Sequence, residues 1–320
     1  LLADIVGSGV LALAGAFSKV GWFFGFFLLI LCCPLNMYTG ILLSRLRKYH
    51  PSAGTYGELG ESLYGKNVGY ICYTFLYVYL FFVLGEYMVV MSRSIQGVRC
   101  YINLLRYSRS LTHTHSTHLT STYTHTQIFY NTNICRPVAG IITCSILLIS
   151  NQARTLRNIA WLSVISFVTI FVVLAICLHD IENDGVVPDS KHDVVRQVSF
   201  WNFYGSLSTF IFAWAGQKIY LEIMSEMKKP SDFPKSLYTS YPVIFILYAC
   251  VVTVGYAYQG RETPGYILET LNYSGTKSFA NLMMFLHMQI SFTLNIQVSS
   301  RAIHRRYDRD LANCIDTSNP

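Results

Sequence analysis

The sequence predicts an all-α protein that crosses a membrane several times. Of its 320 residues, 52% are hydrophobic and 15% are aromatic, whereas only 13% are charged. Soluble globular domains carry about 25% charged residues. The charged residues here also cluster between long uncharged stretches. Together these observations indicate a chain whose solvent is mostly lipid, in which the backbone polar groups have to be satisfied within helices.

Eight stretches are predicted to span the bilayer, because a helix needs about 20 mostly apolar residues to cross about 30 Å of hydrocarbon. Each lies between clusters of charge and contains at most one charged residue. A tail that is too polar to span, residues 301–320, follows the last of them. The eight stretches lie near residues 1–18, 20–44, 67–92, 137–152, 158–178, 197–217, 236–260 and 278–300.

The basic residues predict the orientation of these spans. If the first span runs from inside to outside, the inner loops and the tail hold thirteen Lys and Arg residues against ten outside, five of which flank or lie in one unusual loop. Cytoplasmic loops are enriched in basic residues, so the tail is predicted to be cytoplasmic. The only N-x-S/T sequon then lies outside, which predicts glycosylation at Asn272. The net charge of +7 is therefore attributed to topology and not to nucleic-acid binding.

The unusual loop, residues 100–135, is predicted to be a low-complexity extracytoplasmic insert. It alternates Thr with His over part of its length and holds four of the nine histidines. It could be a luminal metal-binding or pH-sensing tract, or a disordered Ser/Thr-rich loop. Because an ACACAC repeat encodes alternating Thr and His, an artefact such as a retained intron is a third interpretation. No function is assigned to it.

The first predicted span is interrupted by small residues. The interruption reads Val6-Gly7-Ser8-Gly9-Val10, and two glycines that flank a serine weaken a helix. An unwound turn exposes main-chain groups that can bind a substrate carboxylate at a half-helix N-terminus, or a cation through freed carbonyls. The alternative, which these residues leave open, is a small-residue face for helix packing.

The sixth predicted span contains a second interruption. Phe212-Ala213-Trp214-Ala215-Gly216 combines small and aromatic residues, and polar residues follow directly. Breaks in the first and the sixth span are typical of an inverted repeat of five helices. The correspondence favours a site at the two breaks over two unrelated packing faces.

Ionisable side chains within the membrane are functional candidates. Asp4 and Glu86 have no obvious partner in the sequence, so either could carry a coupling proton. Glu222 lies four residues after Lys218, on the same helix face, so it could pair with that lysine or take part in coupling.

The eighth predicted span adds three polar candidates. Ser291 and Thr293 could offer hydroxyl groups to a sodium ion, or could instead bond back to their own helix. His287 is predicted to be a hydrogen-bonded core histidine in preference to a proton relay.

Three motifs resemble those of the amino acid/auxin permease family. GSGVLAL at residues 7–13 is similar to the first-span signature, and TYGELG at 55–60 resembles the loop that follows the second span. FAWAGQ at 212–217 is similar to the sixth-span signature. The motifs occur in the family's order, and the resemblance runs from residue 1 to about residue 300, apart from the insert.

The resemblance implies a leucine-transporter-like inverted-repeat fold with eleven spans, of which about eight are present here, and with helices 1 and 6 broken. It also implies secondary active transport of amino acids by alternating access, coupled to protons more often than to sodium, and no other cofactor. The family's substrate site is expected at the two breaks. It maps here onto Val6, Gly7, Ser8, Gly9 and Val10, and onto Phe212, Ala213, Trp214, Ala215 and Gly216.

Three departures from the family pattern are visible. Many members have Pro where this chain has Ala14, and often His where this chain has Gln217. The second repeat also stops after its third predicted helix. The chain could therefore be a fragment, the product of a gene-model error or a degenerate copy.

The leading interpretation is a proton-coupled amino acid symporter in the plasma membrane or in a vacuolar or other internal membrane. Its expected partners are an amino acid and the lipid bilayer, with no nucleic acid. The alternative is a transport-inactive membrane sensor of amino acids or a degenerate truncated copy. The sequence has no Ser/His/Asp, HExxH or phosphate-loop motif and no Cys/His metal spacing, so no enzyme and no metal site are expected.

Overall fold

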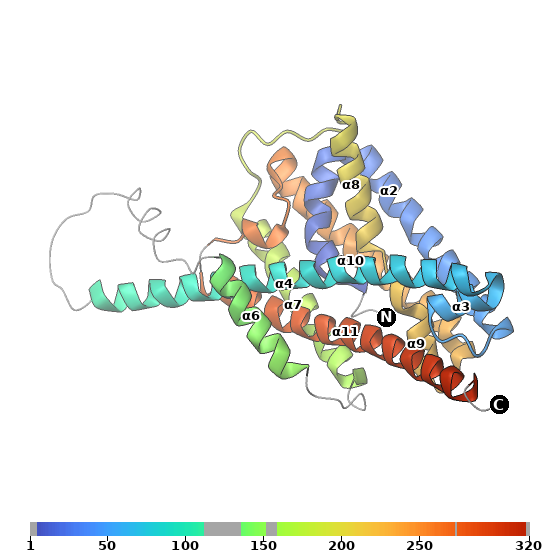
Figure 1. Ribbon diagram of the computed structural model, residues 1–320. Helices are drawn as coiled ribbons and strands as arrows, with labels where there is room; N and C mark the ends of the chain where they lie inside the picture. The colour runs from blue at the N-terminus through green and yellow to red at the C-terminus, as the bar shows by residue number, and fades with distance from the viewer. Residues whose placement is uncertain (1–4, 112–135, 152–158, 273, 318–320) are drawn as a thin grey trace.

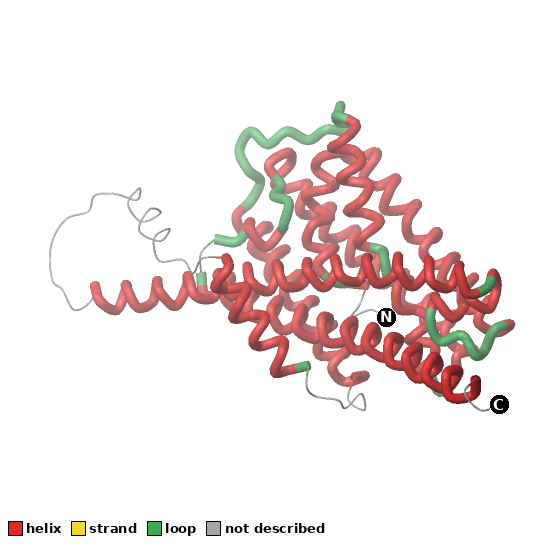
Figure 2. The backbone as a smooth tube through the Cα atoms, in the orientation of Figure 1, coloured by secondary structure: helices red, strands yellow, loops and turns green. Residues whose placement is uncertain are grey.

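The computed structural model describes residues 5–111, 136–151, 159–272 and 274–317, and all regular structure in these ranges is helical (Figure 2). Short 3₁₀ turns, η2 (Gln217–Ile219), η3 (Pro230–Asp232), η4 (Gly260–Glu262) and η5 (Ile267–Thr270), join some of the helices. The α-helices are α2 (Ser8–Tyr49), α3 (Tyr56–Tyr64), α4 (Lys66–Leu111), α6 (Arg136–Ser150), α7 (Ile159–Asp184), α8 (Phe200–Ala213), α9 (Tyr220–Glu226), α10 (Phe233–Gln259) and α11 (Gly275–Thr317).

Four helical stretches of the described residues are long and apolar enough to cross a membrane: Ser8–Tyr49, Lys66–Val98, Trp161–Asp184 and Pro230–Glu262. Pro137–Ser150 is a shorter apolar helix. Large apolar side chains on these helices face outward, as they do in a bundle surrounded by lipid. The chain is thus a multi-pass membrane protein, whereas the count of eight spans and the inverted repeat stay predictions.

The helix α2 contains two of the predicted spans, joined by a sharp bend at Gly21. This residue has φ 82° and ψ 178°, a conformation that favours glycine. On one side of the bend, Ile5 contacts Gly216; on the other, Asn36 accepts a hydrogen bond from Gln217. Ile5 and Asn36 lie sixteen and fifteen residues from Gly21, so the two arms of α2 run back alongside each other from the bend (Figure 1).

The helix α4 is longer than its predicted span. It continues without interruption to Leu111, so residues 100–111 of the predicted insert are helical, and this end projects from the bundle in Figure 1. The rest of the insert, residues 112–135, lies outside the described residues, as does the Thr-His alternation. The other parts of α4 pack against α11, α3 and α6.

The short helix α3 begins with a cap similar to a capping box, in which the glutamate bonds to the residue before the N-cap. The Thr55 side chain accepts a hydrogen bond of 3.3 Å from the Glu58 main-chain N–H, and the Glu58 carboxylate accepts one of 2.7 Å from Gly54 N–H. Gly57 then allows α3 to lie directly against the Tyr73 ring of α4. The TYGELG motif therefore fixes where α3 starts and how closely it packs.

The connection between α7 and α8, residues 185–199, lies across the bend of α2. Trp22 N–H and Phe23 N–H donate to the carbonyls of Asp193 and Val194 at 3.1 and 2.8 Å. Arg196 reaches back from the same connection and donates to the Ser18 carbonyl at 2.9 Å. We call residues 185–199 the outer strap: they hold the bend of α2 to the end of α10, and the distribution of basic residues predicts that they lie outside.

An ion pair attaches the outer strap to η4, which follows α10. The Arg261 guanidinium donates two hydrogen bonds of 2.6 Å to the Asp193 carboxylate. These bonds hold the pKa of Asp193 below its usual value. A carboxylate with a depressed folded-state pKa stabilises the fold above its unfolded pKa of about 3.9, and this contribution is lost as the pH falls through the folded-state value.

We therefore expect Asp193→Asn to lower the melting temperature of the purified protein near neutral pH. Between pH 5 and pH 3 (roughly, from the carboxylate reference pKa) the difference from the wild type should shrink, because the wild-type carboxylate becomes protonated. Thermal unfolding followed across this pH range checks the expectation. A difference that stays constant down to the acid end of the range would contradict it.

The first arm of α2 packs against α8 through a glycine. A Cβ atom built on Gly9 would lie 2.8 Å from the Cα atom and 3.1 Å from the Cβ atom of Ala213. Real Cβ atoms do not approach a backbone atom so closely, so the two helices can touch here only because residue 9 has no side chain.

Gly9→Ala should therefore destabilise the protein by about 1–3 kcal/mol, the usual cost of overpacking a filled interior. The matched control is Gly85→Ala on α4, where a Cβ atom would meet nothing within 4 Å. Melting temperatures of the two variants in detergent test this. Equal stability of both variants would show that the contact between α2 and α8 is looser than described.

Candidate functional site

The break in the first predicted span lies directly before α2. Val6 and Gly7 are not helical, and Gly7 N–H donates to the Ile5 carbonyl at 2.9 Å. The helix α2 then begins at Ser8, and no side chain caps its start at Gly7. Because the first N–H groups of a helix have no partner within it, a buried, uncapped helix start is suited to an anionic group.

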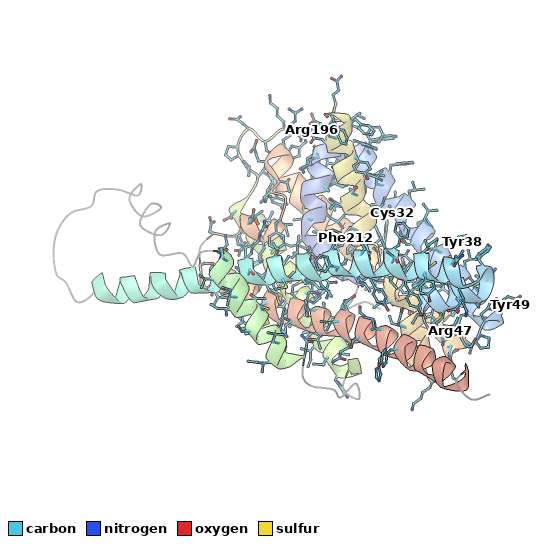
Figure 3. The ribbon with its side chains drawn as sticks, in the orientation of Figure 1. Cys32, Tyr38, Arg47, Tyr49, Arg196 and Phe212 are labelled. Atoms are coloured by element: carbon cyan, nitrogen blue, oxygen red, sulfur yellow. The ribbon has the colours of Figure 1, made fainter. Side chains whose placement is uncertain are left out.

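The break in the sixth predicted span lies between α8 and η2. The helix α8 ends at Ala213, and Trp214 to Gly216 form a tight turn in which Gly216 N–H donates to the Trp214 carbonyl at 2.8 Å. Ala213, Trp214 and Gly216 are buried, whereas Phe212 and Ala215 are partly buried. In Figure 3 Phe212 lies between Arg196 at one end of the bundle and Arg47 toward the other.

The two breaks lie against each other. In addition to the contact of Gly9 with Ala213, a Cβ atom on Gly216 would lie 2.6 Å from the Ile5 side chain. The residues that the resemblance assigned to the substrate site are thereby brought together from two segments about 200 residues apart.

One residue that the sequence reasoning missed joins the two breaks. The Tyr248 hydroxyl of α10 lies 2.9 Å from the Ile5 carbonyl oxygen and 2.8 Å from the Ala213 carbonyl oxygen. Tyr248 is fully buried. The sequence does predict that a tyrosine in an apolar helix finds a hydrogen-bond partner for its hydroxyl. It does not show which residue that partner is.

Trp214 lies at the centre of an aromatic cluster. Its ring is stacked on Tyr241, with centroids 5.7 Å apart, and meets Tyr248 edge-on at 5.0 Å. Trp214 is fully buried, and its Nε1–H has no hydrogen-bond partner among the described residues. The buried Ser8 hydroxyl likewise makes no hydrogen bond within the described part of the chain. Buried polar groups normally have partners, so each break holds a group that a ligand could satisfy.

Of the coupling candidates, Glu86 lies beside this site. It stands on α4, half-buried, and the Ser8 hydroxyl and the Lys218 ammonium act on its carboxylate electrostatically. Ser8 makes no hydrogen bond of good geometry with it. Asp4 lies outside the described residues. The structure thus brings one predicted carboxylate to the break of the first span.

Glu222 lies further along, on α9, where it is buried and has Tyr56 of α3 among its electrostatic neighbours. The segment before it is anchored to other helices. The Tyr56 hydroxyl donates to the Gln217 carbonyl, and Arg47 donates to the Leu221 carbonyl at 2.6 Å. The pairing of Glu222 with Lys218 stays a prediction.

Gln217 occupies the position at which many family members have His. Its amide Nε2–H donates to Asn36 Oδ1, and it lies 3.2 Å from the Thr39 hydroxyl. Both partners belong to the second arm of α2. Gln217 therefore ties the segment after the break to α2 through its side chain.

The polar candidates of α11 lie on a helix that packs mainly on α4 and α7. The Thr293 hydroxyl donates to the Gln289 carbonyl at 2.9 Å, which is the helix back-bonding that was one of its two interpretations. Ser291 is buried, and its hydroxyl makes no hydrogen bond within the described residues. Nδ1 of His287 lies 2.8 Å from the Ser166 carbonyl oxygen, as expected of a core histidine.

Asn272, the predicted glycosylation site, is exposed in the connection before α11. Its amide Nδ2 lies 3.2 Å from an Asp184 carboxylate oxygen. Glycosylation there stays a prediction.

Comparison with known proteins gives the chain a family. Residues 1–319 match the family described as "Transmembrane amino acid transporter protein". The chain is 27% identical to Amino acid transporter AVT1D of Arabidopsis thaliana over 259 residues, which are 80% of this chain and 42% of that protein. It is 24% identical to Probable amino acid permease 7 of the same plant, over 97% of this chain and 66% of the relative.

A fungal relative gives the same result. The N amino acid transport system protein of Neurospora crassa is 24% identical over 82% of this chain and 51% of its own length. The chain thus spans about half the length of several curated relatives that it matches. The motifs, the helical bundle and these matches agree: the chain belongs to the transmembrane amino acid transporter protein family, a family of multi-pass membrane transporters and not of enzymes.

Proposed function

We propose that this chain carries the substrate site of a secondary active amino acid transporter that works by alternating access, driven by protons in preference to sodium. The observation that carries the proposal is the contact between two broken helices, beside which the buried Trp214 Nε1–H and Ser8 hydroxyl make no hydrogen bond of good geometry with the described residues. Interrupted helices that meet near mid-membrane are the usual site for substrate and ions in secondary transporters.

The chemistry of the two breaks suits an amino acid. The uncapped start of α2 at Ser8 offers main-chain N–H groups and the positive end of a helix to a carboxylate. Glycines at positions 7 and 9 leave the main chain accessible to a close ligand. The Trp214 indole supplies an apolar surface and an N–H donor beside the second break. We assign the substrate's carboxylate to the α2 break and its side chain to the α8 break.

The coupling proton is assigned to Glu86. It is the described coupling candidate whose carboxylate interacts with the α2 break, through Ser8. A proton on this carboxylate would change the charge beside the substrate site, which is how proton binding can favour one state of the transporter over another. Asp4 and Glu222 remain alternative carriers of the proton.

Uptake into liposomes that contain the purified protein tests the function. We expect a mixture of radiolabelled amino acids to accumulate when a pH gradient is imposed, acid outside, and not when a sodium gradient is imposed. Binding of an amino acid without uptake under either gradient would instead favour the membrane sensor. The absence of both binding and uptake would contradict a substrate site at the breaks.

Glu86→Gln should abolish the response to the pH gradient, with a loss of at least about tenfold in gradient-driven uptake, the effect of about 1.4 kcal/mol on a barrier. Exchange of labelled for unlabelled substrate without a gradient should continue, because the amide keeps the size of the side chain. The matched control is Glu262→Gln, an exposed residue of η4. If Glu86→Gln and Glu262→Gln show equal gradient-driven uptake, Glu86 does not carry the coupling proton, and another carboxylate has to be assigned that role.

A further inference from the structure

Two main-chain carbonyls, one from each broken helix, converge on a single hydroxyl group. The carbonyls belong to Ile5, just before the first break, and Ala213, the last residue of α8. The hydroxyl is that of Tyr248, at 2.9 and 2.8 Å from them. The three residues are 4%, 2% and 0% exposed, so no bulk water reaches this junction to share the hydrogen bonds.

This junction attracts positive charge. Both carbonyl oxygens are acceptors only, and the hydroxyl has one proton to share between them. The Ile5 carbonyl also accepts a hydrogen bond from Gly7 N–H, which leaves its second lone pair for the hydroxyl. The carbonyl of Ala213 also stands at the C-terminal end of α8, where the helix carries partial negative charge. In transporters with broken helices, freed carbonyls of this kind and C-terminal helix ends coordinate the coupling cation.

The tyrosine is held in place by its surroundings. Its ring meets the fully buried Trp214 edge-on, and its helix, α10, packs closely on α2. The hydroxyl therefore reaches the junction from a fixed side chain on a third element, so the two breaks can be joined without any ion.

We propose that the Tyr248 hydroxyl takes the place of a coupling cation at the junction of the two broken helices. Its proton satisfies the carbonyls that a sodium ion would otherwise coordinate, so the wild-type protein has no sodium site here. Replacing the ring by a small side chain that carries an oxygen ligand opens a site for a dehydrated monovalent cation. The inference rests on the proposed function only in treating the cation as a coupling ion. What it predicts is the binding of sodium, which can be measured without transport.

The test is the sodium dependence of thermal stability. The purified protein is unfolded by heat in sodium chloride and in choline chloride of the same ionic strength. The wild type should melt at the same temperature in both salts. Tyr248→Asn, which removes the ring and adds a carbonyl oxygen, should melt higher in sodium than in choline by roughly 2 °C. Tyr248→Phe should melt lower than the wild type in both salts, because the ring still fills the junction while both carbonyls lose the hydroxyl donor and the Ile5 carbonyl keeps its bond from Gly7 N–H.

Tyr241 provides matched controls. It lies two turns earlier on α10, is also fully buried and also contacts Trp214, but its hydroxyl pairs with the Tyr220 hydroxyl at 2.7 Å and not with main-chain carbonyls. Tyr241→Asn should therefore show no preference for sodium. If Tyr248→Asn is not recovered folded, Tyr248→Ser opens the same space and offers a hydroxyl oxygen.

Two results would overturn the proposal: a wild-type protein stabilised by sodium relative to choline, or Tyr248 variants whose sodium dependence equals that of Tyr241→Asn. Failed uptake with a sodium-insensitive wild type would count against the proposed function alone. A sodium-stabilised wild type would count against the role of Tyr248 and leave amino acid transport standing.

Discussion

The need to satisfy main-chain polar groups away from water governs this structure. An unbroken helix meets that need by itself, whereas a broken helix leaves N–H and C=O groups that other residues have to satisfy. The chain breaks two helices and places the breaks in contact, and the Tyr248 hydroxyl bridges a carbonyl from each. Glycines at positions 9 and 216 make the contact possible, and the aromatic residues of α10 close it from the side. Glu86 lies beside Ser8, the first residue of α2 after the non-helical Val6 and Gly7.

The positions of the helix breaks could be predicted because the effect of glycine on a helix depends on the residue itself and not on distant partners. Gly7 and Gly216 weaken helices, so the positions of both breaks could be predicted from the sequence, and the family resemblance explained why they belong together. The first break is shorter than predicted, because Ser8, Gly9 and Val10 are already part of α2. The family and the multi-pass membrane character are confirmed by the comparisons. The TYGELG motif could likewise be recognised, and its Thr and Glu form the cap of α3.

What could not be predicted depends on partners far apart in the chain. Tyr248 is one of many tyrosines in apolar surroundings, and only the tertiary fold shows that its hydroxyl meets carbonyls 243 and 35 residues away. Whether the Thr293 hydroxyl is available to a sodium ion or bonds back to its own helix could also be decided only from the structure, in which it donates to the Gln289 carbonyl. Residues 100–111 were assigned to a loop by their low-complexity neighbours, yet they contain neither Gly nor Pro, so nothing in them ends α4.

The outer strap has a mechanical consequence for the two broken helices. Arg196 of the strap holds the end of α2's first arm at Ser18, and α8 begins only four residues later, at Phe200. At their other ends the same two helices meet at Gly9 and Ala213. These attachments at both ends oppose sliding of the two helices past each other and favour their tilting as a pair. Any rocking motion that exposes the proposed substrate site would then pivot about contacts outside this pair, such as those of α2 with α10.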